Sequence, residues 1–193
     1  MLLEINNAIV SQLDLKELLN GISICLRRVL PHDAALLTLH DVEGKQLRLH
    51  ALDLQVLGKA PFEEGVESSV ENTPEGEAIK TRQPVLVGPA VDLTRFPSPR
   101  VRKAVENGVR SGCAVPLISH DRALGALSVV SLKENAFNEA DVELLVQSAS
   151  QIAIAVENAL NFDLSRKVEQ QAARERDRLR LLLDINNAVV SHL

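Results

Sequence analysis

The stretch SGCAVPLISHDRALGALSVV, residues 111–130, contains two apolar runs separated only by His120-Asp121. Runs of this length, rich in Val, Leu, Ile and Ala and joined by so short a connection, predict a buried antiparallel pair of strands over 111–119 and 122–132. No other part of the chain gives an equally clear strand signal. We therefore expect this hairpin to form the centre of a sheet.

The sequence predicts a helix near the N-terminus, before this hairpin, and another after it. Residues 2–30 carry apolar side chains at helical spacing, and Pro31 ends the pattern. After the hairpin, Asn138 with Asp141 three positions later resembles a capping box. Neither Gly nor Pro occurs from there to Leu193, which predicts one long helix.

Shorter elements complete the predicted fold. Strands are expected at 34–41, 46–53, 66–70 and 84–87, helices at 74–82 and 99–107, and a loop over 88–99. The pattern predicts an α+β fold with an antiparallel sheet of five to six strands. The N- and C-terminal helices would cover one face, and loops and short helices the other.

The two ends of the chain contain an internal repeat. Residues 3–13 read LEINNAIVSQL and residues 183–193 read LDINNAVVSHL, with eight of eleven positions identical. A repeat at this distance predicts a parent protein with tandem modules of about 180 residues. We therefore expect residues 1–162 to form one domain. Residues 163–193 would form a connecting signalling helix that runs into the start of a second repeat.

Composition restricts the class of protein. The 193 residues carry a net charge of −5, and the basic residues of 166–180 are interleaved with acidic ones, which argues against direct contact with nucleic acid. The two Cys are far apart, as in proteins with reduced thiols. The N-terminus has no signal peptide and no apolar run is long enough to cross a membrane, so we expect a cytoplasmic protein without membrane contact.

Catalytic and metal-binding signatures are not found in the sequence. It contains no Gly-rich phosphate loop, no nucleophile elbow and no His-Glu-x-x-His run. The histidines are scattered without metal-ligand spacing. We therefore expect a protein that is not an enzyme and has no metal site, and the sequence indicates no particular cofactor.

Three segments resemble the GAF domain family. They are the step from the short helix at Gly76 into Pro84-Val85, the central hairpin described above, and the closing helix from Phe137 to Asn158. The repeated Leu-(Glu/Asp)-Ile-Asn-Asn-Ala opening is similar, more narrowly, to the tandem GAF region of sigma-54-dependent transcriptional activators of the formate hydrogenlyase activator type. The resemblance implies a sensory domain that holds a small effector between its sheet and its loop-rich face.

The resemblance also gives candidate ligand residues. Asp92, Arg95, Phe96 and Arg100 lie on the segment expected to cover the sheet, and Arg110 is expected at its rim. Ser111 and Cys113 share one strand face with Val115, and they line the pocket if that face is the covered one. Several arginines beside a small cavity suit a small anion. Cyclic nucleotides fit poorly, because Leu132 and Val142 replace the Asn and the Glu of the signature carried by cyclic-nucleotide-binding members of the family. Covalent bilins fit poorly because bilin-binding members commonly have a His directly after the Cys, and neither Cys of this chain is followed by a His.

These observations favour a sensory domain of a bacterial transcriptional regulator, which binds a small effector and signals as a homodimer through its terminal helices. Two alternatives stay open at the sequence level. One is a dimerisation and interaction module without a ligand. The other is the same kind of sensor attached to a histidine kinase or a cyclic-dinucleotide signalling enzyme.

Overall fold

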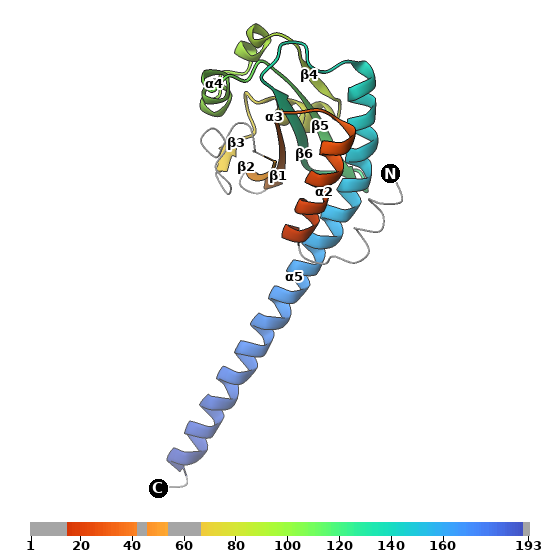
Figure 1. Cartoon of the computed structure of the whole chain (residues 1–193). Helices are drawn as coiled ribbons and strands as arrows, with labels where there is room; N and C mark the ends of the chain where they lie inside the picture. The colour runs from red at the N-terminus through yellow and green to blue at the C-terminus, as the bar shows by residue number, and fades with distance from the viewer. Residues whose placement is uncertain (1–14, 42–45, 54–66, 191–193) are drawn as a thin grey trace.

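The computed structural model describes residues 15–41, 46–53 and 67–190, and Figure 1 shows their arrangement. Six strands form one sheet in the order β3-β2-β1-β6-β5-β4, and all neighbours are antiparallel. The strands are β1 (Ala34–Asp41), β2 (Gln46–Asp53), β3 (Glu67–Ser69), β4 (Val85–Val87), β5 (Ser111–Ser119) and β6 (Arg122–Ser131). The predicted hairpin is therefore β5–β6, and the predicted α+β class is confirmed.

Two helices cover one face of the sheet and form what we call the helix layer. They are α2 (Leu15–Val29) and α5 (Glu139–Val190), which lie side by side in Figure 1. The core beneath them contains Leu37, Val115 and Leu127 from the strands, packed with Leu26 and Ile152 from the helices. The first part of the predicted helix over 2–30 lies outside the described residues.

Three short elements cover the other face and form the cover layer: α3 (Pro74–Thr81), the 3-10 helix η1 (Ala90–Arg95) and α4 (Pro99–Glu106). A second core, with Leu36, Ala114, Ala78, Phe96 and Val101 among its members, joins this layer to the sheet. The prediction of a loop over 88–99 is corrected by η1. Its turn forms because the Asp92 amide donates to the Pro89 carbonyl and the Thr94 hydroxyl donates to the Val91 carbonyl.

The long helix α5 runs without a break from Glu139 to Val190. Its last fully buried side chain among the described residues is Ala159, and the helix then continues well beyond the domain (Figure 1). The division into a domain over 1–162 and a connecting helix over 163–193 stays a prediction. No helix within the described ranges combines the length and apolarity needed to cross a bilayer.

A carboxylate fastens the start of β1 to the end of β6. Asp33 Oδ2 accepts hydrogen bonds from the Ser131 hydroxyl at 2.6 Å and the Leu132 amide at 2.7 Å. Burial raises the pKa of Asp33, but these hydrogen bonds and the nearby Lys133 outweigh it and hold the pKa below its usual value. The ionised form therefore stabilises the fold.

The substitution Asp33→Asn is expected to lower the free energy of unfolding by about 1 kcal/mol at neutral pH. Because the folded pKa is depressed, this contribution is present above the unfolded pKa and is lost as the pH falls through the folded pKa. The wild type and the variant should therefore approach each other in stability as the pH falls below the usual range of an aspartate. Urea unfolding at several pH values measures this, with Asp92→Asn on the exposed surface as the control. A constant difference at all pH values would contradict the assignment.

Candidate functional site

The covered face of the sheet carries polar side chains at its centre. Thr38 of β1 alternates with Leu37 and Leu39, which pack into the helix layer, so the Thr38 side chain faces the cover layer. Ser128 of β6 lies between Leu127 and Val129, which also belong to the helix-layer core. Both polar residues are buried, with exposed fractions of 0% for Thr38 and 2% for Ser128.

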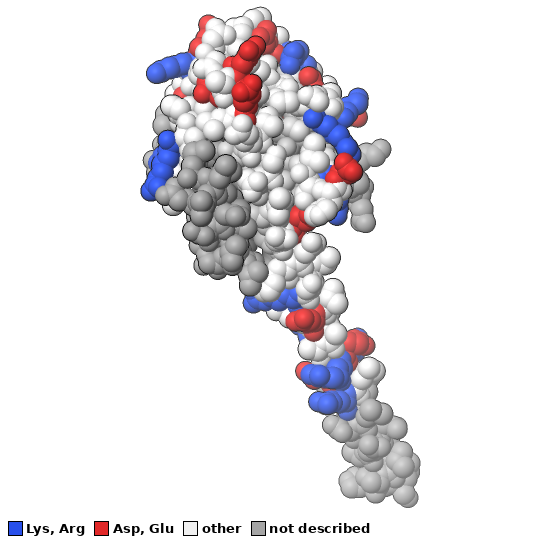
Figure 2. Space-filling view, turned by 90° about the vertical axis from the view of Figure 1, so that its right-hand side faces the viewer, with Lys and Arg blue, Asp and Glu red and all other residues white. Residues whose placement is uncertain are grey.

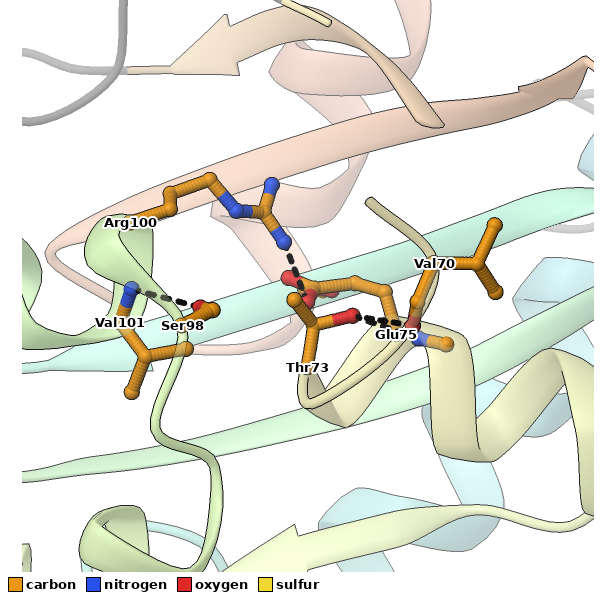
Figure 3. A network of polar contacts seen from close by, with 8 residues as sticks. Val70, Thr73, Glu75, Ser98, Arg100 and Val101 are labelled. Atoms are coloured by element: carbon orange, nitrogen blue, oxygen red, sulfur yellow. Dashed lines mark hydrogen bonds and ion pairs between the residues drawn. The ribbon is translucent and has the colours of Figure 1, made fainter. Parts of the chain in front are cut away.

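Two helix starts place opposite charges over this part of the sheet. α3 begins with Thr73 as N-cap, whose hydroxyl accepts from the Gly76 amide at 3.0 Å, followed by Pro74 and Glu75. α4 repeats this pattern with Ser98 as N-cap, followed by Pro99 and Arg100. In each helix the charged residue directly follows the proline. Figure 3 shows the two helix starts with Glu75 and Arg100 pointing toward each other.

Glu75 and Arg100 form a buried ion pair. The Arg100 Nη2 nitrogen donates to Glu75 Oε2 at 2.5 Å, and the side chains are only 12% and 7% exposed. The second oxygen, Glu75 Oε1, accepts from the Ser128 hydroxyl at 3.0 Å. The pair therefore connects α3, α4 and β6. We call these three residues, together with Thr38 on the same face of the neighbouring strand β1, the Glu75–Arg100 cluster.

Two polar atoms in this cluster have no partner within the part of the chain that the structure describes. They are the Arg100 Nη1 nitrogen and the Thr38 Oγ1 oxygen, and both are buried. In Figure 3 the second terminal nitrogen of Arg100 points away from Glu75. Buried donors are normally satisfied, because an unmet guanidinium or hydroxyl group costs about 1–3 kcal/mol. The two atoms are available to a bound molecule that accepts hydrogen bonds.

The residues predicted on the cover segment divide into two groups. Arg100 lies in the cluster, and Phe96 is buried in the core of the same face. Arg95 and Asp92 are exposed. Arg95 pairs with Glu77 at 3.7 Å and lies over the Phe96 ring, 4.8 Å from its centroid.

The remaining predicted residues lie away from this cluster. Arg110 Nη1 donates to the carbonyls of Val105 and Val109, at the end of α4. The Ser111 hydroxyl donates to the Lys133 carbonyl at 2.6 Å and accepts from the Ala136 amide at 3.3 Å, which fastens the connection into α5. Arg110 and Ser111 are therefore engaged in local backbone contacts.

Cys113 lies in the core of the helix layer, on the face opposite the cover layer. The condition under which Ser111 and Cys113 would line the pocket is therefore not met for Cys113, because the side of β5 that faces the cover layer presents Ala114. Burial, with a smaller effect of Asp141, raises the pKa of the Cys113 thiol to about 12. This thiol is protonated at neutral pH.

Sequence reasoning missed Thr38, Glu75 and Ser128. The signal for Glu75 was present in the Thr73-Pro74-Glu75 and Ser98-Pro99-Arg100 runs, which share one capping pattern and end in opposite charges. Among the described residues, no three His, Cys, Asp or Glu side chains are grouped to hold a metal ion.

The chain is similar to two transcriptional activators. It is 27% identical over 191 residues to the formate hydrogenlyase transcriptional activator FhlA of Escherichia coli (strain K12), covering 97% of this chain and 27% of that protein. It is 29% identical over 165 residues to the DNA-binding transcriptional activator HyfR of the same strain, covering 82% of this chain and 24% of that protein. The chain thus spans only about a quarter of the length of these relatives.

Solved structures share the fold. The GAF domain of a two-component sensor histidine kinase from Bacillus halodurans matches with a TM-score of 0.67 at 19% identity, covering 79% of this chain and 99% of that one. Free methionine-R-sulfoxide reductase from Neisseria meningitidis, solved with its substrate, matches with a TM-score of 0.62 at 20% identity, covering 81% and 86%. The family model described as GAF domain matches residues 12–157. By this match, the chain belongs to the GAF domain family.

Proposed function

We propose that this chain is the sensory domain of a transcriptional regulator and that it binds a small oxyanion, such as a carboxylate, at the Glu75–Arg100 cluster. The similarity to the two activators supports the regulatory role. The observations that carry the ligand proposal are the Arg100 Nη1 nitrogen and the Thr38 hydroxyl, which are both buried and without a partner among the described residues.

The chemistry of these groups favours a small, oxygen-rich ligand. A guanidinium offers several N–H donors in one plane, and Glu75 accepts from only one of its two terminal nitrogens. A carboxylate could accept from Nη1 and from the Thr38 hydroxyl, and so satisfy both groups at once. The ligand should be small, because the cluster lies under α3 and α4 among packed side chains such as Phe96 and Leu36.

The substitution Thr38→Val tests this proposal, because it removes the hydroxyl and keeps the shape of the side chain. Thr38 Oγ1 has no hydrogen bond within the described residues, so the free protein should keep or slightly increase its stability. The affinity for the ligand should fall about tenfold, as expected for a lost hydrogen bond to a charged group. The measurement is the shift of the thermal unfolding midpoint with formate, acetate or succinate, against sodium chloride at equal ionic strength.

The matched control is Thr94→Val, since the exposed Thr94 hydroxyl donates locally to the Val91 carbonyl of η1. This variant should respond to the anion as the wild type does. Equal responses of all three proteins would show that binding, if present, occurs elsewhere. The absence of a response in the wild type to every carboxylate tested would favour an interaction module without an oxyanion ligand.

We also propose that a second copy of the chain pairs along α5. The apolar residues Val146, Ile154, Leu164, Val168 and Leu179 are exposed, and their spacing places them in a stripe on α5 away from the centre of its buried face. In Figure 2 the domain surface above the extension carries few charged side chains, whereas the extension itself carries both basic and acidic ones around its apolar residues. A stripe that continues from the domain onto its helical extension favours a partner helix of similar length, which a second copy supplies.

Replacement of Val168 by Glu should convert a dimer into a monomer without lowering the thermal stability of the domain. Val168 is 56% exposed and lies beyond Ala159, so its substitution removes no contact of the domain core. Sedimentation analysis measures the change in mass. The control is Gln170→Glu, which adds the same charge on the other side of the helix. A wild type that is monomeric at all concentrations would contradict the pairing proposal.

A further inference from the structure

The turn between β5 and β6 is held from the cover layer by α3. Arg82, the C-cap of α3, donates from Nη2 to the Asp121 carbonyl oxygen at 2.7 Å. Its Nη1 nitrogen lies 3.9 Å from the Asp121 carboxylate. The end of α3 is therefore attached to the tip of the central hairpin, seven residues after Glu75 (82 minus 75).

The same turn is held from the helix layer by α5. Glu157 Oε2 accepts from the Ser119 hydroxyl at 2.6 Å and lies 3.0 Å from His120 Nδ1. The Ser119 and His120 hydrogen bonds hold the pKa of Glu157 below its usual value, so this group is a carboxylate at neutral pH. Elements on opposite faces of the sheet thus hold one turn of the chain.

The turn itself has a restricted backbone. His120 and Asp121 have φ angles of +46° and +61°, a left-handed conformation in which residues with a Cβ are uncommon. It follows a register shift between Leu117 and Ile118, where the regular β5–β6 ladder is interrupted. Such a conformation persists where the surrounding contacts stabilise it. Loss of one contact of the turn should therefore alter the geometry of its other contacts.

Glu157 lies where α5 leaves the domain. The last fully buried side chain described on this helix is Ala159, two residues later. The helix then extends over 31 residues (190 minus 159), which is about 46 Å at 1.5 Å per residue. A small rotation of the helix at Glu157 would therefore be amplified into a large movement at its far end.

We propose that the His120–Asp121 turn mechanically couples α3 to α5. Arg82 transmits a displacement of α3 to Asp121, and Ser119 and His120 transmit it to Glu157 at the base of the helical extension. The inference rests on the proposed function, because α3 carries Glu75 of the ligand cluster and α5 carries the proposed output. It adds the route between them, which passes from one face of the sheet to the other around the β5–β6 turn, at the ends of these two strands.

Hydrogen–deuterium exchange of the full chain without ligand tests the coupling. The variant is Arg82→Asn, since Asn tolerates the left-handed conformation of Arg82 (φ +58°) but cannot replace its guanidinium contacts. Within the described ranges Arg82 contacts Asp121 and has no hydrogen bond or ion pair with α5, yet this variant should speed exchange in α5 peptides spanning Glu157 by about fivefold or more. The matched control is Arg95→Asn, since Arg95 is equally exposed (53%) and pairs with Glu77 of α3 away from the turn.

The control variant should leave exchange in these α5 peptides within about twofold of the wild type. Glu157→Ala alone should speed their exchange, and adding Arg82→Asn to it should have little further effect, because both changes interrupt one route. Equal exchange in the Arg82 and Arg95 variants, or multiplying effects in the double variant, would overturn the proposal. No ligand is used, so this outcome is independent of whether an oxyanion binds at the cluster.

Discussion

Replacing Glu75 by alanine is expected to lower the free energy of unfolding by about 3–5 kcal/mol. The reason is that Arg100, only 12% exposed, would keep its charge and lose its counter-ion. The Ser128 hydroxyl would lose its acceptor in the same substitution. Urea unfolding followed by circular dichroism measures the change. A loss below about 1 kcal/mol would show that water reaches Arg100 and that the cluster is not a closed site.

The double variant Glu75→Leu with Arg100→Leu separates stability from binding. Replacing both members of a buried ion pair by apolar residues is often neutral or stabilising, so most of the lost stability should return. The response to carboxylates should not return, because the Arg100 donors are absent. A double variant that is restored in stability and still responds to the anion would place the ligand away from the cluster.

The substitution Gly76→Ala is expected to be about as damaging as overpacking of a core, on the order of 3 kcal/mol. A Cβ atom at this position would lie 1.6 Å from the Val70 carbonyl oxygen and 2.7 Å from the Val70 carbonyl carbon. Both are backbone atoms, and the same carbonyl accepts from the Thr73 hydroxyl that caps α3. The start of α3 would have to move, and Glu75 with it, so the carboxylate response should also weaken.

The control for this prediction is Gly88→Ala. Among the described residues, a Cβ atom there would meet the side-chain end of Asn135, at 2.5 Å from Oδ1, which can rotate away. Its cost should be no more than about 1 kcal/mol. Thermal unfolding of the two variants side by side gives the comparison. Equal costs at the two positions would contradict the close contact between α3 and Val70.

Much of the fold could be predicted from the sequence because its elements are marked locally. The hairpin predicted at 111–119 and 122–132 is observed as Ser111–Ser119 and Arg122–Ser131. The proline and capping signals at Thr73-Pro74 and Ser98-Pro99 correctly located the starts of α3 and α4. In contrast, η1 was predicted as loop, because a single 3-10 turn has no periodic apolar pattern to mark it.

The candidate site was harder to predict because its geometry is not local. Alternation along β5 separates Cys113 from Ala114, but it cannot show which side meets the helices, since both sides of this strand are apolar. Glu75 was overlooked because a carboxylate is usually exposed, and the partner that allows its burial lies 25 residues away in α4. Thr38 and Ser128 join the cluster only through the strand order of the folded sheet.

An NMR titration of the wild-type protein with the carboxylate that gives the largest thermal shift tests the central claim most directly. The proposal predicts that the largest shift changes occur at the amides of Thr38, Glu75 and Ser128 and at the side-chain N–H groups of Arg100. Changes centred on the helix-layer core around Cys113, or no changes at any concentration that raises the unfolding midpoint, would contradict it.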